Sequence, residues 1–78
     1  MNPLKKFKED NPHITWEEIS KKTGLPIQTL MSVQKKSAKE IGGVTIGTLV
    51  MLSNVYDINL VNYYLSNKQI YGIKKHNA

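Results

Sequence analysis

Apolar residues recur at helical spacing through the first half of the chain. Three pairs lie three positions apart, namely Leu4 and Phe7, Trp16 and Ile19, and Leu30 and Val33. Residues three or four positions apart share one face of an α-helix, so each pair predicts a short helix with one buried face. Polar residues fill the positions between them, and the pattern therefore predicts three short amphipathic helices.

The second half is more apolar. After Thr45, a candidate cap, a fourth helix is predicted, and its inward residues are Ile46, Leu49, Val50 and Ser53, with Leu52, Val55 and Tyr56 widening the apolar stripe. A fifth helix is apolar over too wide an arc for burial on one side, with Leu60, Val61, Tyr63, Tyr64 and Leu65. Neighbouring residues on a helix point about 100° apart, so Tyr63 and Tyr64 do not both fit a core. We expect one of them, or the segment that includes Ile70 and Tyr71, to cover a dimer interface.

Residues that favour helix ends separate these segments. Asn2 before Pro3 is typical of an N-cap followed by a first-turn proline. Thr15 and Glu18 have the spacing of a capping box, and Gly24 is expected to end the second helix in a left-handed conformation. Pro26 is predicted to open the third helix in its first turn. Residues 36–44 are predicted to be a linker, loosest at its two glycines.

Length limits the chain to one domain. Seventy-eight residues form a small core, and burial of further surface by dimerisation would help such a chain. We expect a compact all-α domain of five helices over residues 1–67. Residues 68–78 are expected to form either a basic tail or a short strand. The chain has no cysteine, which fits a reducing compartment, and the charged N-terminus lacks the apolar core of a signal peptide. We therefore expect a cytoplasmic protein.

The charge is basic and unevenly distributed. The net charge is +5, with eight Lys and four acidic residues in positions 1–39 and no charged residue between Ile41 and Tyr56. This balance favours a polyanionic partner, although lysines that merely solvate a small surface explain it about equally well. The uncharged run is shorter than the roughly 20 residues of a membrane span, and we expect no membrane partner. All eleven cations are Lys, which contacts phosphate but lacks the planar fork that Arg offers to guanine.

The chain offers little for catalysis. His13 and His76 have no partner at ligand spacing, so no metal site is expected. The glycines at 42, 43 and 47 lack the Lys-Ser/Thr that a phosphate-binding loop requires. We expect neither an enzyme nor a cofactor.

Residues 16–35 resemble the helix-turn-helix of the Cro/CI-type family, also called lambda-repressor-like or XRE. The positions that carry the resemblance are Ile19 and Ser20 in the first helix, Gly24 and Leu25 in the turn, and Leu30 and Val33 in the second helix. The segment from Thr45 to Leu65 is similar to the fourth and fifth helices of that family, with Leu49 and apolar residues at 56 and 58.

This resemblance implies a dimeric repressor that binds double-stranded DNA. The third helix would enter the major groove and place four residues against the bases: Ile27, Gln28, Met31 and Ser32. Phosphates would be held by the start of the second helix and by the lysines after the third, which gives Thr15, Trp16, Lys35, Lys36 and Lys39. Size and family resemblance suggest a phage or other mobile element as the source of such a regulator.

Departures from the family pattern leave a second hypothesis open. Trp16 stands where the family often has Gln, Pro26 replaces a Ser or Thr cap, and a lysine-rich linker follows Val33. With two apolar residues, Ile27 and Met31, on the outer side of the third helix, that face could instead bind another regulatory protein. An anti-repressor, an antitoxin and an anti-CRISPR-type inhibitor are the candidates of this kind.

Overall fold

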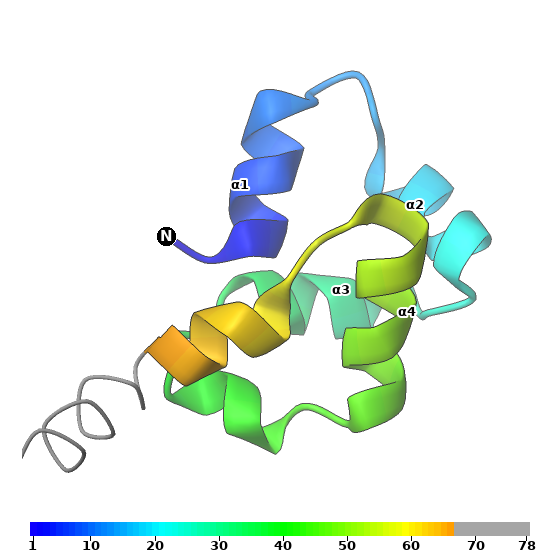
Figure 1. Cartoon of the computed structure of the whole chain (residues 1–78). Coiled ribbons are helices and arrows are strands. Elements are labelled where there is room, and N and C mark those ends of the chain that lie inside the picture. The colour runs from blue at the N-terminus through cyan, green and yellow to red at the C-terminus, as the bar shows by residue number, and fades with distance from the viewer. Residues whose placement is uncertain (67–78) are drawn as a thin grey trace, which may run out of the picture.

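The computed structural model describes residues 1–66, and these are helical. The elements are α1 (Pro3–Asp10), α2 (Trp16–Thr23), α3 (Ile27–Gln34), the 3-10 helix η1 (Glu40–Gly43) and α4 (Ile46–Tyr56), as Figure 1 shows. The chain is helical again over residues 60–66. The described part contains no strand, which confirms the predicted all-α class. Residues 68–78, with Ile70 and Tyr71, lie outside the described residues.

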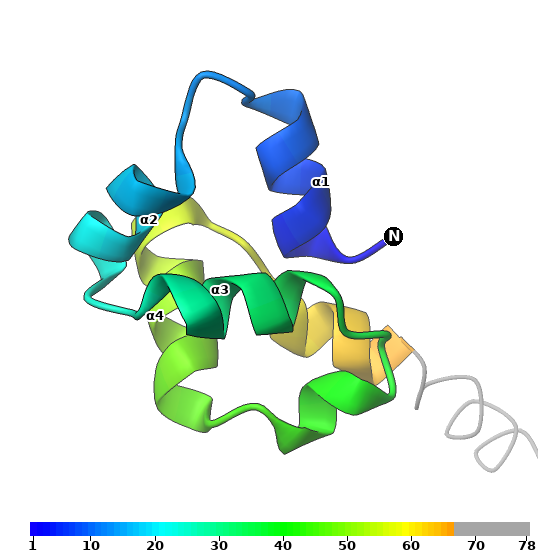
Figure 2. The same ribbon diagram turned by 180° about the vertical axis from the view of Figure 1, so that it is seen from behind.

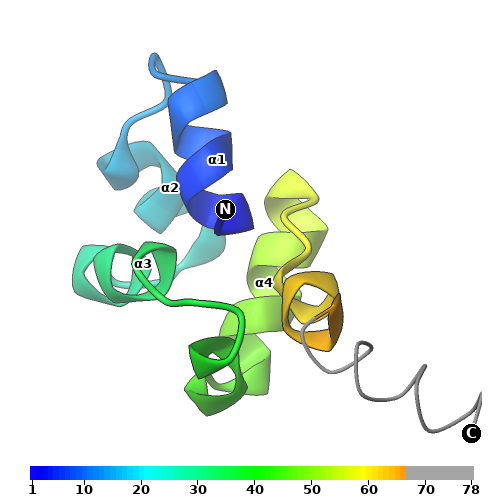
Figure 3. The same cartoon turned by 90° about the vertical axis from the view of Figure 1, so that its left-hand side faces the viewer.

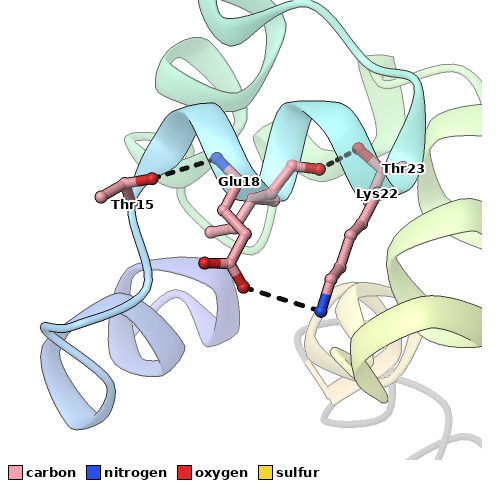
Figure 4. A network of polar contacts seen from close by, with 5 residues as sticks. Thr15, Glu18, Lys22 and Thr23 are labelled. Carbon is pink, nitrogen blue, oxygen red and sulfur yellow. Dashed lines mark hydrogen bonds and ion pairs between the residues drawn. The ribbon is translucent and has the colours of Figure 1, made fainter.

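The predicted helix ends are present. The Asn2 side chain caps α1 by accepting from the backbone N–H groups of Leu4 and Lys5. Thr15 caps α2 through a bond of 3.1 Å from the Glu18 N–H to its hydroxyl (Figure 4). The Glu18 carboxylate pairs with Lys22 at 3.6 Å, one turn further on. Gly24 ends α2 at φ 74°, the left-handed conformation expected of it.

Eight apolar side chains form one core. They come from each of the described helices and from the segment between α4 and the last helix: Leu4, Ile19, Leu30, Val33, Ile41, Leu52, Ile58 and Leu60. The predicted inward pair of α3, Leu30 and Val33, is buried. Helix α3 packs against α1 and α2, and α2 also packs against α4 (Figures 1 and 2). Because both neighbours cover the same side of α3, its opposite side is left at the surface.

The Asn2 side chain connects the start of α1 to the end of α3. While its side-chain oxygen caps α1, its amide nitrogen donates to the carbonyl oxygens of Val33 and Lys36, both at 2.8 Å. These carbonyls lie at the C-terminal end of α3, where helix geometry leaves backbone oxygens without intrahelical partners. The Asn2 residue is only 5% exposed. One buried amide therefore fixes the start of α1 to the end of α3.

The turn between α2 and α3 is held by side chains of α2. The Ser20 hydroxyl donates to the Leu25 carbonyl at 2.6 Å, and the Thr23 hydroxyl accepts from the Leu25 N–H at 3.2 Å. The Thr23 hydroxyl also donates to the Ile19 carbonyl at 2.7 Å (Figure 4). Both polar backbone groups of Leu25 are thus satisfied, and the entry into α3 is fixed.

The predicted inward face of α4 is partly wrong. Leu52 is buried and Leu49, Ser53 and Tyr56 are partly buried, as expected. Thr48, which was not predicted to face inward, is also buried. Ile46 and Val50, predicted inward, are 77% and 48% exposed, and Val55 is also exposed. Apolar residues surround α4, so spacing alone did not determine which arc meets the core.

Three smaller expectations also need correction. The predicted linker contains η1, whose Ile41 is a core residue. Pro26 is the N-cap of α3 and not its first helical residue. Thr45 stands at the N-cap of α4, but its hydroxyl meets the Thr48 hydroxyl at 3.0 Å and makes no bond to the helix backbone.

A left-handed residue, Asp57, and a capping residue, Asn59, lie between α4 and the last helix. Asp57 has φ 58°, and the Ile58 N–H donates back to the Leu52 carbonyl at 3.2 Å. Asn59 then caps the helix over residues 60–66 by accepting from the Asn62 N–H at 2.8 Å. The fourth and fifth helices are thus separated at residues 57–59. No helix among the described residues has the length and hydrophobicity needed to cross a membrane.

We predict that Asn2→Ala lowers the free energy of unfolding by about 2–4 kcal/mol, because it removes a cap and leaves two carbonyls without their amide donor. Asn2→Asp keeps the cap acceptor but places a buried carboxylate oxygen against the carbonyl oxygens of Val33 and Lys36, so it should destabilise at least as much as Asn2→Ala. Urea titration followed by circular dichroism measures both.

A matched control is Asn11→Ala at the other end of α1. Asn11 makes one side-chain bond, to the Phe7 carbonyl at 2.9 Å. Its loss should cost about 1 kcal/mol or less. Equal losses for the two alanine variants would show that the link from α1 to α3 is not important for stability.

Candidate functional site

Three residues form a ridge along the exposed side of α3 and just beyond its end. Gln28 and Ser32 are four apart on α3, so they lie above one another along the helix axis. Lys36 follows the C-cap residue Lys35. All three line two different surface depressions, one on each side of the helix. They therefore form the raised edge between the two. Figure 2 shows α3 on the near side of the molecule, free of neighbouring helices there.

The first depression gathers most of the predicted DNA contacts. It has a volume of about 520 Å³ and is lined by Ile27, Gln28, Met31, Ser32, Lys35, Lys36 and Glu40. Thus all four predicted base-contacting residues and two of the predicted phosphate-binding lysines share one surface. Lys39, the third of these lysines, is exposed and immediately precedes Glu40.

The second depression lies between α3 and the start of α4. It has a volume of about 390 Å³ and adds Thr29, Thr45 and Thr48 to the ridge residues. None of these three hydroxyl-bearing residues was predicted to belong to the site. Thr45 indicated a helix start, but nothing in the sequence indicated that this start lies beside α3.

Thr15 lies on a third depression, at the start of α2. Its lining also includes Glu17, Glu18, Ser20, Lys21 and Ile27, and Ile27 connects it to the α3 surface. Two carboxylates and one ammonium group line this region, and one of the carboxylates, Glu18, is also paired with Lys22. The region therefore has no excess of positive charge, and it attracts a phosphate less than the lysines beyond α3 do.

The Trp16 side chain lies away from this surface. Its ring is half-buried against the core, and the Lys8 ammonium lies 5.6 Å from the ring centroid. What Trp16 offers a phosphate is its backbone N–H in the first turn of α2, which helix geometry leaves without an intrahelical partner.

Glu40 is the one acidic residue of the first depression. Its carboxylate accepts from the Ser37 N–H at 2.9 Å. The pKa of Glu40 is lowered, first by this backbone bond, then by the Ser37 side chain and by the positive charge of Lys36. Ser37 and Glu40 have the capping-box spacing, which the sequence contained but which we did not use to predict a helical turn there. The box fixes a negative charge beside Lys35 and Lys36.

The remaining predicted site residues within the described part of the chain are Tyr63 and Tyr64, which were assigned to a dimer interface. Tyr63 and Tyr64 are both half-buried and pack against the core, so the expectation that only one of them fits there was wrong. A methyl group on Gly42 would lie 2.9 Å from a ring carbon of Tyr64, so the absence of a side chain at residue 42 allows this ring to pack closely. Within residues 1–66, no group of three potential metal ligands comes together.

Comparison of the chain with known protein families, curated proteins and solved structures gave no match. The resemblance to the Cro/CI-type family therefore remains a hypothesis that depends on the individual positions named above.

We predict that Glu40 contributes stability that is lost in acid. A carboxyl whose pKa is lowered by folding stabilises the folded state above its ordinary pKa, and this contribution disappears as the pH falls through the folded-state value. Glu40→Gln keeps an oxygen acceptor for the Ser37 N–H and removes the titration. Between about pH 5 and pH 3, the thermal midpoint of wild type should therefore fall more steeply than that of the variant. Parallel pH profiles would contradict the capping role of the charge.

Proposed function

We propose that this protein is a sequence-specific DNA-binding transcriptional regulator, a small repressor of phage or mobile-element type that binds a palindromic operator as a dimer. The observation that supports this most strongly is the α3 surface. There, Gln28 and Ser32 stand on an exposed ridge that continues into Lys36.

The chemistry of the ridge suits a DNA groove. A Gln amide pairs with the N6 and N7 edge of adenine, a Ser hydroxyl bonds with several bases, and apolar groups contact the thymine methyl. These three kinds of contact would come from Gln28, from Ser32 one turn further along α3, and from Ile27, which precedes Gln28. Lys35, Lys36 and Lys39 follow at its end and would contact the phosphate backbone. Repression would result from occupancy, because a dimer with α3 helices in grooves about 34 Å apart blocks polymerase access.

A second function is favoured by the apolar part of the same surface. Ile27 is 39% exposed, Met31 lies beside it, and Glu40 places a negative charge at the edge of the depression. A protein ligand would contact all three residues, and this protein would then act as an anti-repressor, an antitoxin or an anti-CRISPR-type inhibitor. Salt separates the two functions. DNA binding with six to ten phosphate contacts should weaken about 10³–10⁵-fold between about 50 and 200 mM salt, whereas an apolar protein interface should change little.

The deciding experiment is selection of bound fragments from a random duplex library at physiological salt. A palindromic consensus would support both DNA recognition and dimeric binding. Recovery of fragments with no shared sequence, at all salt concentrations, would reject sequence-specific binding and favour the protein ligand.

We predict that Gln28→Ala and Lys36→Ala weaken DNA binding in different ways. Loss of the Gln28 amide should reduce the preference for the selected sequence by about 1–3 kcal/mol, with little change for unrelated DNA. Loss of the Lys36 charge should weaken all sequences alike and reduce the salt slope by about one. Competition titrations with specific and unrelated duplexes measure both effects. Identical behaviour of the two variants would refute the assignment of Gln28 to base contact.

A further inference from the structure

The outer side of α4 is apolar. Its exposed positions are Ile46, Gly47, Val50, Met51, Asn54 and Val55. None of them is charged, and Ile46 and Val50 are 77% and 48% exposed. On an 11-residue helix these positions share one half of the circumference. A helix with one solvated side normally carries polar or charged residues there, so an apolar outer side indicates a surface that another molecule covers.

At Ile46, this surface adjoins the last helix. Val61 and Leu65 are four apart on residues 60–66 and are 43% and 41% exposed. A groove of about 350 Å³ joins the two helices, and it is lined by Ile41, Gly42, Val44, Ile46, Leu49, Val61 and Tyr64. We call the exposed side chains of Ile46, Val50, Met51, Val55, Val61 and Leu65 the apolar face. Figure 3 shows α4 and residues 60–66 next to each other, and α3 on a different side of the molecule.

The absence of charge on α4 indicates which kind of partner this face binds. The run from Ile41 to Tyr56 contains no charged residue in a chain of net charge +5. Two copies repel each other over most of their basic surfaces but meet without repulsion through a neutral face. A neutral, apolar face is also complementary to itself, which a two-fold symmetric interface requires. A polyanion has nothing to bind there.

We propose that the apolar face is the interface of a homodimer, in which it packs against the same face of a second copy. This rests on the proposed function for the expectation of a dimer and deepens it by naming the surface. The earlier prediction placed the interface at Tyr63, Tyr64, Ile70 and Tyr71. The groove includes Tyr64, so the two assignments meet at the last helix, but α4 supplies most of the new one.

The size of the face predicts a reversible dimer. A standard interface buries about 800 Å² on each partner, whereas α4 is only about 16 Å long. Two helices this short limit the area that the face can bury. Dissociation should therefore be measurable at micromolar concentrations. The α3 ridges of both copies would remain exposed, since the ridge and the apolar face share no residue.

The test is sedimentation velocity of the full chain, without DNA, from about 5 to 500 µM. Wild type should shift from monomer to dimer over this range. Val50→Glu places a charge within the interface and should raise the dimer dissociation constant at least tenfold, or about 1.4 kcal/mol. The matched control is Ile27→Glu, the same kind of change at an exposed helical position outside the apolar face, and it should dimerise as wild type does.

A charge-pair experiment guards against a variant that merely misfolds. Val50→Glu and Val50→Lys should each dimerise more weakly than wild type, and their equimolar mixture should associate more tightly than either variant alone because the opposite charges attract each other. Circular dichroism checks that each variant is folded. Wild type that is monomeric at about 500 µM would overturn the proposal, as would a Val50→Glu dimer of unchanged affinity. Binding of monomeric wild type to neutral phosphatidylcholine vesicles would also overturn it and assign the face to lipid.

These outcomes are separate from those of the DNA selection. A dimer that passes the sedimentation test but selects no DNA sequence would leave this interface standing and reject the proposed function. A monomer that selects a non-palindromic half-site would leave DNA recognition standing and reject the interface.

Discussion

The position of α3 depends on one buried amide. Asn2 accepts two backbone N–H groups at the start of α1 and donates to two carbonyls at the end of α3. The N-cap of α3, Pro26, has no side chain that could accept from the helix. An asparagine is suited to this task because its side chain accepts through its oxygen and donates two N–H groups through its nitrogen. Ionised Asp has no donor, Ser has only one, and an apolar residue has none.

The opposite end of α3 is held by a different device. Ser20 and Thr23 satisfy the carbonyl and the N–H of Leu25, and Gly24 supplies the left-handed residue between them. Ser20 is one of the positions that carry the family resemblance. Because its hydroxyl bonds to the turn, Ala would fit the space but lose the bond. With both ends fixed, the ridge of Gln28, Ser32 and Lys36 is presented on a rigid helix, and a preorganised helix loses less entropy when it binds a partner.

The parts of this structure that sequence predicts best are local. A cap such as Asn2 or Thr15 is determined by residues within one turn, and the turn at Gly24 by the conformation that glycine tolerates, so both were predictable. The inward pair of α3 was predictable too, because polar residues mark its other side. Helix α4 has no such marking, and which of its apolar residues are buried depends on neighbours that lie far away in the sequence. The link from Asn2 to Val33 spans 31 positions and has no local signature. For the candidate site, the α3 residues follow from helical periodicity, whereas the nearness of Thr45 to the ridge follows only from packing.

The two exposed helical surfaces solve different problems for a small chain. On α3, polar and basic groups surround a few apolar atoms, so the surface stays hydrated until a ligand displaces the water. On α4, the exposed Ile and Val side chains have no polar neighbour except Asn54, and their hydration is unfavourable at about 25 cal/mol per Å². Turning α4 about its axis would not remove this cost, because every arc of the helix is apolar, and it would expose Leu52 in place of Val50. The unfavourable exposure is therefore built into the sequence of α4 itself. Association relieves it, which is why an interface on α4 fits this sequence better than a merely solvated face.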